Sequence, residues 1–118
     1  MTQYAAELVQ TANAMIATGK GILAADESTG TIGKRLASIN VENNPTNRRD
    51  YRELLFRTPG LSEFCSGIIT YEETLFDTAK DGTPLVDLIK SAGIVPGIKV
   101  DMGVRPLYGT DGETVTQG

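Results

Sequence analysis

An α/β fold is predicted from the pattern of apolar segments along this 118-residue chain. Three short, mainly apolar runs, over residues 21–26, 65–71 and 95–101, have the composition of buried strands. Segments with helical signals separate these runs. Because the connections are too long for hairpin turns, the strands are expected to be parallel and joined by crossover helices. The length of the chain predicts a single domain, residues 1–118.

The first helix is expected over residues 3–18 and the first strand directly after it, over residues 21–26. Apolar residues recur in the helix at spacings of three and four and form one stripe: Tyr4, Leu8, Ala12, Met15 and Ile16. Gly19 and Gly21 end the helix. The uninterrupted apolar run that follows predicts a strand buried on both faces.

Two helices are expected between the first and second strands. Residues 28–38 are expected to form a short helix or helical turn. Asn44 and Pro45 supply an N-cap residue followed by proline at the first helical position, which predicts a helix over residues 45–57. Cys65, at the start of the second strand, is expected to be a buried small hydrophobe.

The last third of the chain is expected to contain one helix, one strand and one loop. Thr83 and Pro84 repeat the capping signal and predict a helix over residues 85–92, followed by the third strand over residues 95–101. Residues 109–118 are rich in Gly, Thr and Asp and are expected to form a surface loop.

Composition excludes several classes of function. The net charge of -4 provides no general attraction for a polyanion, so nucleic acid is not an expected partner. Arg48, Arg49 and Arg52 could bind a small anionic ligand, but they are expected to lie on a solvated helix face. The first helix lacks the continuous apolar run of a signal peptide or membrane span, and a single cysteine forms no intrachain disulfide. A cytoplasmic protein without membrane contact is expected.

Histidine is absent, which removes the commonest metal ligand and the usual general base from these residues. Zinc-hydrolase and Ser-His-Asp mechanisms are therefore excluded within this stretch. The candidate chemistry has to come from carboxylates, hydroxyls and basic side chains.

Polar residues that could carry chemistry lie at the end of the first predicted strand and in the segment after it. Asp26 ends the strand, where it could cap the next helix or act as an acid at the rim of an active site. Ser28, Thr31 and Arg35 are three and four residues apart and share one helix face, so they could bind a phosphate together. The two hydroxyls could equally be simple helix caps.

Lys99 is the least ordinary residue of the third predicted strand. It alternates with Gly97 and Asp101 on one strand face, while Ile98 and Val100 occupy the other. A strand covered on both faces would bury this lysine, which is expensive unless the ammonium is paired or functional. An edge strand would leave Lys99 in water.

Five segments in order resemble the class I fructose-bisphosphate aldolase family and together cover essentially the whole chain. They are GKGILAADESTGTIGKRL (residues 19–36), ENNPTNRRDYRELLF (42–56), GIITYEETLF (67–76), DGTPLVDLIKSAGIVPGIKVD (81–101) and GTDGETVTQG (109–118).

The resemblance implies that the chain is the N-terminal part of a (β/α)8 TIM barrel that assembles into a homotetramer. The family cleaves fructose 1,6-bisphosphate to dihydroxyacetone phosphate and glyceraldehyde 3-phosphate in glycolysis and gluconeogenesis, with neither metal nor cofactor. A lysine amine forms an iminium with the substrate ketone and withdraws electrons from the breaking bond.

Several positions match family site residues. Asp26 matches the active-site aspartate near the Schiff base, and Lys99 matches an active-site lysine on the third strand. Ser28 and Thr31 match hydroxyl positions near the phosphate on carbon six, where serine is frequent at the position of Thr31. Arg35 and Lys34 match basic residues at the mouth of the same pocket.

The resemblance also implies that the Schiff-base lysine, the acidic proton-transfer residues and a C-terminal tyrosine lie beyond Gly118. A complete barrel needs about 250 residues. We therefore expect an incomplete barrel domain that is inactive alone. The alternatives are a short, non-catalytic paralogue that binds sugar phosphate or a protein, and a different barrel enzyme for another phosphorylated sugar. The choice between fructose 1,6-bisphosphate and fructose 1-phosphate stays open.

Overall fold

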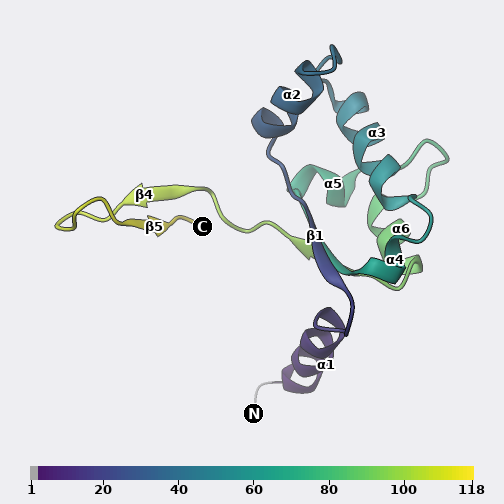
Figure 1. The fold of residues 1–118 in the computed structure, drawn as a ribbon, viewed down its shortest axis with the longest axis horizontal. Helices are drawn as coiled ribbons and strands as arrows, with labels where there is room; N and C mark the ends of the chain where they lie inside the picture. The colour runs from purple at the N-terminus through teal and green to yellow at the C-terminus, as the bar shows by residue number, and fades with distance from the viewer. Residues whose placement is uncertain (1–2) are drawn as a thin grey trace.

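The computed structural model describes residues 3–118, in which helices and strands alternate along the chain (Figure 1). The elements are α1 (Ala5–Met15), β1 (Gly21–Ala25), α2 (Thr29–Ala37), α3 (Pro45–Phe56), α4 (Leu61–Phe64), β2 (Cys65–Thr70), α5 (Glu72–Phe76), α6 (Leu85–Ser91), β3 (Val95–Ile98), β4 (Val104–Pro106) and β5 (Thr114–Thr116).

Strands β1, β2 and β3 form a parallel sheet with β2 in the centre. The register places Ala25 opposite Thr70, and Thr70 opposite Ile98, so the carboxyl ends of all three strands lie level. The prediction of a mixed α/β fold with parallel strands is confirmed. Within residues 3–118 the sheet is open and no closed barrel is formed.

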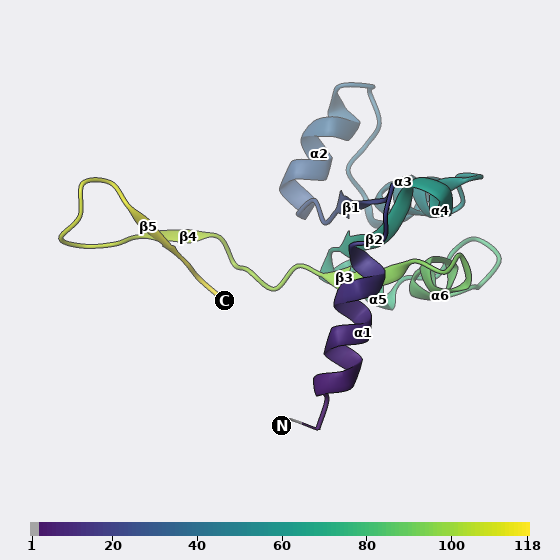
Figure 2. The same cartoon turned by 60° about the horizontal axis from the view of Figure 1, so that its bottom comes forward.

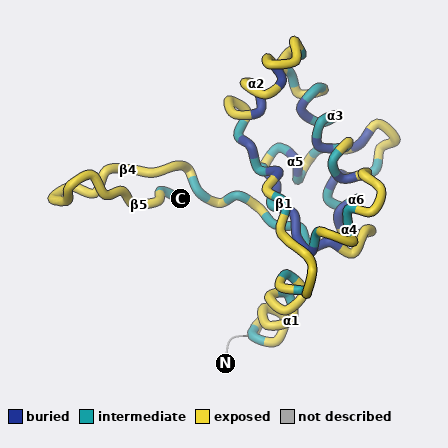
Figure 3. The backbone as a smooth tube through the Cα atoms, in the orientation of Figure 1, coloured by how far each residue is buried: buried dark blue, intermediate teal, exposed yellow. Residues whose placement is uncertain are grey.

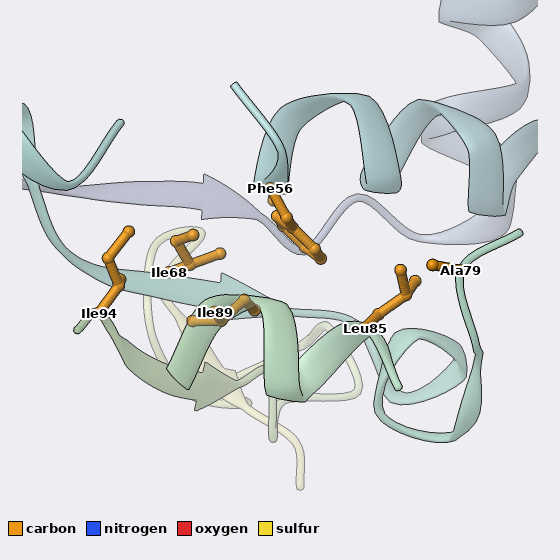
Figure 4. Packing of buried hydrophobic residues seen from close by; sticks show 7 residues of the cluster. Phe56, Ile68, Ala79, Leu85, Ile89 and Ile94 are labelled. Carbon is orange, nitrogen blue, oxygen red and sulfur yellow. The ribbon is translucent and has the colours of Figure 1, made fainter. Parts of the chain in front are cut away.

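Helices α3 and α6 cover one face of this sheet and enclose the core with it (Figure 4). The buried cluster consists of Ala25, Phe56, Ile68, Ala79, Leu85, Ile89 and Ile94. Side chains from β1, β2, α3 and α6 meet there because each element presents one apolar face to the others. This packing fixes the direction of the strands and hence the position of their carboxyl ends.

The opposite face of β1 is open, which corrects the prediction that this strand is buried on both faces. Leu23 and Ala25 pack against the core, whereas Ile22 is 48% exposed and Ala24 is also exposed. The reason is that no element among residues 3–118 covers the second face of the sheet. Figure 3 shows that most of β1 is exposed.

Helix α1 forms where the sequence predicts a helix, but most of its apolar stripe is exposed within residues 3–118. Met15 is the exception, because it is half-buried beside Gly67 of β2. Leu8 is 63% exposed and Ile16 is 77% exposed. Only the carboxyl end of the helix reaches the sheet, where the Ser66 hydroxyl lies 2.6 Å from the carbonyl oxygen of Met15 and 3.2 Å from that of Gly21. Figure 2 shows α1 projecting away from the sheet.

Asn44 caps its helix as predicted, and Ser28 acts as a cap, which is one of the two alternatives considered for its hydroxyl. The Ser28 hydroxyl accepts a hydrogen bond from the amide of Thr31 at 3.4 Å, and the Asn44 side chain accepts one from the amide of Asn47 at 2.9 Å. At the third site the prediction is wrong, because Pro84 itself occupies the N-cap position of α6 and no side chain caps the helix.

Several elements were not predicted or have other bounds. The short helices α4 and α5 were not expected. The third strand ends at Ile98 instead of residue 101. Residues 114–116 were assigned to a loop, whereas the structure pairs β5 with β4 in an antiparallel hairpin that extends away from the sheet (Figure 1). These elements are three to five residues long, too short for a periodic apolar signal.

Cys65, expected to be buried, is half-buried and packs at the margin of the core.

Among residues 3–118, no helix has both the length and the apolar character needed to cross a membrane.

The isolated 118-residue chain is expected to aggregate, because the apolar stripe of α1, one face of β1 and the free edges of β1 and β3 all face solvent. Size-exclusion chromatography, binding of a hydrophobic dye and thermal unfolding would test this. We expect large species, strong dye binding and a broad transition. A sharp, cooperative transition of a monomer would contradict the prediction.

Candidate active site

A pocket of about 780 Å³ lies at the carboxyl ends of the three parallel strands. Carboxyl ends of parallel strands are where α/β proteins build ligand sites, because loops from neighbouring strands converge there. The pocket is lined by Ser28, Tyr71, Glu72, Lys99, Val100, Asp101, Met102 and Gly103.

Lys99 lies between two carboxylates beside this pocket. Its Nζ atom is 2.6 Å from Oδ1 of Asp101 and 3.5 Å from Oδ2 of Asp26. The Lys99 amide donates to the carbonyl of Thr70 at 2.9 Å and so extends the pairing of β3 by one residue. Because Ala25, Thr70 and Ile98 are paired in register, the residues that follow them, Asp26 and Lys99 among them, emerge at the same height.

The sequence allowed either a buried Lys99 or one in water, and the structure lies between these two alternatives. Its side chain is 29% exposed, so it is neither enclosed nor free in water. The hydrogen bond from Lys99 to Asp101 raises the pKa of the lysine, and the charge of Asp26 acts in the same direction. The same ion pair lowers the pKa of Asp101. Both groups are therefore charged at neutral pH.

Asp26 does not cap helix α2, so that alternative is wrong. Ser28 is the N-cap residue, and its hydroxyl oxygen lies 3.2 Å from that of Thr31. The Asp26 carboxylate contacts Lys99 instead. Ser28 lines the pocket, whereas Thr31 is exposed one turn further along the helix.

Arg35 and Lys34 lie in the last turn of α2 and do not line this pocket. Arg35 forms an ion pair with the carboxylate of Glu27, which is itself almost fully buried. Lys34 is exposed. The structure therefore brings Ser28 and Lys99 to the pocket, with Asp26 directly behind Lys99, and leaves the two basic residues of α2 outside the pocket lining.

The prediction that Arg48 and Arg52 lie on a solvated helix face is wrong. Arg48 is 8% exposed and Arg52 is 0% exposed. Arg48 binds both carboxylate oxygens of Glu73 through Nε, at 3.0 and 3.2 Å, and through Nη2 at 2.6 Å. Arg52 donates to the same carboxylate at 3.0 Å. These contacts hold the pKa of Glu73 below its usual range, Arg48 contributing most.

The segment that follows β1 is held by the same arginine. Nη2 of Arg52 donates to the backbone carbonyl of Glu27 at 2.7 Å, and the guanidinium carbon lies 5.7 Å from the centre of the Tyr71 ring. Sequence reasoning did not find this contact. The spacing of four between Arg48 and Arg52 places them on one helix face, but nothing in that spacing identifies the face as buried.

A second pocket, of about 460 Å³, lies between the carboxyl end of α3 and the loop before α6. Its charged groups are paired with one another: Lys80 with Asp50 at 2.9 Å, and Arg57 with Glu53 at 2.8 Å and Asp81 at 2.5 Å. Hydrogen bonds from Thr83 and Arg57 lower the pKa of Asp81 to about 2. The charged side chains around this pocket therefore neutralise one another.

Within residues 3–118, no group of three His, Cys, Asp or Glu side chains is arranged to hold a metal ion.

Comparison with known proteins identifies the family of the chain. The family described as fructose-bisphosphate aldolase class-I matches residues 7–118. The chain is 62% identical over 117 residues to fructose-bisphosphate aldolase 6, cytosolic, of Arabidopsis thaliana, which covers 99% of this chain and 33% of the relative. It is 60% identical over 112 residues to fructose-bisphosphate aldolase 2 of Caenorhabditis elegans, which covers 95% of this chain and 31% of the relative.

A solved structure has the same fold over the whole chain. It is the co-crystal structure of fructose-bisphosphate aldolase from Plasmodium falciparum in a ternary complex with TRAP and a small-molecule inhibitor. The TM-score is 0.93 at 51% identity, over 100% of this chain and 34% of that one. The chain thus spans about a third of the length of the proteins it matches. The match extends over nearly all of its residues, and the chain belongs to the class I fructose-bisphosphate aldolase family.

Proposed function

We propose that this chain contributes one side of the active site of a class I fructose-bisphosphate aldolase. The enzyme would cleave fructose 1,6-bisphosphate to dihydroxyacetone phosphate and glyceraldehyde 3-phosphate through an iminium, without a metal. The observation that carries this proposal is the Lys99 ammonium between Asp26 and Asp101, at the carboxyl ends of the strands and beside a pocket.

Asp26 is proposed as the catalytic carboxylate of this chain. It is held 3.5 Å from Lys99, and its side chain is 24% exposed, so it is fixed in place yet accessible to a ligand. A carboxylate in this setting can hydrogen-bond a substrate hydroxyl and accept its proton as the carbon–carbon bond breaks. The Lys99 ammonium beside it holds the carboxylate in position by charge attraction.

Lys99 is proposed to act electrostatically and not as the nucleophile. An amine has to lose its proton before it attacks a carbonyl, and the hydrogen bond to Asp101 raises the pKa of Lys99. The iminium-forming lysine is therefore proposed to be a residue other than Lys99, and the family resemblance implies a position beyond Gly118. Lys99 keeps its charge and can attract a substrate phosphate.

Ser28 is proposed as the principal phosphate ligand of this chain, since its hydroxyl lies at the pocket and at the amino end of a nine-residue helix. Thr31, Arg35 and Lys34 are proposed to act further out along the same helix, where the two cations would attract an anion into the pocket. The phosphorylated sugar is the proposed ligand.

The complete enzyme is proposed to be a cytosolic homotetramer. Support for the location comes from the relatives, which include proteins named cytosolic or cytoplasmic isozymes. The open sheet face and the exposed stripe of α1 would be covered by further parts of a barrel.

A chimera tests the proposed function. Residues 1–118 would replace the corresponding third of the Arabidopsis enzyme, whose matching region is 62% identical. Cleavage of fructose 1,6-bisphosphate would then be measured with a coupled assay, alongside fructose 1-phosphate. Activity within about tenfold of the parent enzyme is expected. A soluble, tetrameric chimera without activity would favour the non-catalytic paralogue instead.

In this chimera, Asp26→Ala is expected to lower kcat by a factor of about 100 or more, because general acid–base catalysis contributes that much. KM should change little, since a carboxylate that acts in the transition state contributes less to ground-state binding. Steady-state kinetics give both constants. Asp87→Ala, at an exposed aspartate of α6, is the matched control. A raised KM with unchanged kcat would reduce Asp26 to a binding residue.

Borohydride reduction in the presence of dihydroxyacetone phosphate tests the role of Lys99. The reagent converts an iminium into a stable secondary amine, and peptide mass mapping locates the modified lysine. We expect the adduct in the part of the chimera that comes from the Arabidopsis enzyme, and none on Lys99 at pH 7, because Asp101 keeps its amine protonated. An adduct on Lys99 would overturn the assignment.

A further inference from the structure

We propose that Arg52 is a positioning residue for the active site: its buried guanidinium ties the segment that carries Asp26 and Ser28 to the end of the neighbouring strand. This inference rests on the proposed aldolase function. It concerns a residue outside the pocket, since Arg52 is not among the residues that line it.

The first step is the contact with the segment after β1. Asp26, Glu27 and Ser28 connect the last residue of β1 to the first of α2. Within this segment, the carbonyl of Glu27 accepts the hydrogen bond from Nη2 of Arg52 at 2.7 Å. Glu27 lies directly between Asp26 and Ser28, so a displacement of its peptide moves both side chains.

The second step is the anchor of the guanidinium. Nη1 of Arg52 donates to Glu73 at 3.0 Å, and the guanidinium also stacks near the ring of Tyr71. Both residues follow β2, and Tyr71 lines the pocket. The rigid guanidinium therefore joins the ends of β1 and β2 at a defined separation.

The third step is the stiffness of this anchor. The carboxylate of Glu73 is also bound by Arg48, whose Nη1 atom donates to the side chain of Asn43 at 2.9 Å. The side chain of Arg52 is fully buried and that of Glu73 is 25% exposed, so salt screens this ion pair less than a pair in open solvent. The carboxylate of Glu27 is held in turn by Arg35.

A displacement of a reacting group by about 1 Å can lower a rate by about 100-fold. If Arg52 fixes the position of the segment that carries Asp26, weakening the hydrogen bonds of its guanidinium should reduce kcat. The size of this reduction should depend on whether Asp26 is present. A purely structural role would reduce activity by the same factor whether or not Asp26 is present. A double-mutant cycle separates the two roles.

The cycle uses Arg52→Lys and Asp26→Ala, alone and combined, in the chimera defined above. Lysine keeps the positive charge of Arg52, but it lacks the planar guanidinium that donates hydrogen bonds to Glu27 and Glu73 at the same time. We expect Arg52→Lys to lower kcat by about 10-fold to 100-fold when Asp26 is present, and by less than about threefold when it is alanine. Thermal unfolding and the tetramer fraction are measured for every variant, and kcat is expressed per folded enzyme.

Glu73→Gln provides a second variant, for the case that Arg52→Lys does not fold. It preserves the shape of the anchor and removes its charge, and its effect on kcat should also depend on Asp26. Arg57→Lys is the matched control, because Arg57 is an exposed arginine at the carboxyl end of the same helix. Its kcat should stay within about twofold.

An unmodified chimera without activity would refute the proposed function itself, and the inference with it. An active chimera in which Arg52→Lys and Glu73→Gln keep kcat would overturn the inference and leave the function intact. Equal losses with and without Asp26 would also overturn it and would make Arg52 a structural residue only.

Discussion

Two guanidinium groups are buried between helix α3 and the ends of β1 and β2, and one carboxylate, that of Glu73, binds both. Leaving either arginine without this partner would place an uncompensated charge in a buried site, which typically costs about 3–5 kcal/mol. The cluster therefore constrains three elements together: α3, the start of α5 and the segment after β1. The pocket is formed by the last two of these and by the end of β3, so its geometry depends on the cluster.

The fold could be predicted from sequence wherever a local signal decides the structure. Ser28 and Asn44 cap their helices because a side-chain oxygen reaches an amide three residues later, an interaction that needs no tertiary context. Arg48 and Arg52 show where such reasoning fails. Two arginines four residues apart fit a solvated face equally well, and only the position of Glu73, which is 25 and 21 residues away from them, makes that face a buried one.

The residues of the candidate site could be predicted from the sequence, whereas the contacts that hold them in place could not. Asp26 ends the first predicted strand and Lys99 lies near the end of the third, and parallel strands in register bring such residues to one edge of the sheet. The family resemblance pointed to the same two positions. Neither route revealed the hydrogen bond from Arg52 to the carbonyl of Glu27, because backbone acceptors are present at every residue and carry no signal in the sequence.

The charges around Lys99 limit how strongly this chain can attract an anionic ligand. One ammonium, that of Lys99, faces the two carboxylates of Asp26 and Asp101, and Arg35 is paired with the carboxylate of Glu27. A phosphate that approaches Lys99 must compete with a carboxylate. Asp101 makes the shorter contact with Lys99, at 2.6 Å, but its side chain is 36% exposed and open to hydration, whereas Asp26 is 24% exposed on a segment held by Arg52. Exchange of Asp101 for phosphate would therefore keep the contact between Lys99 and Asp26 intact.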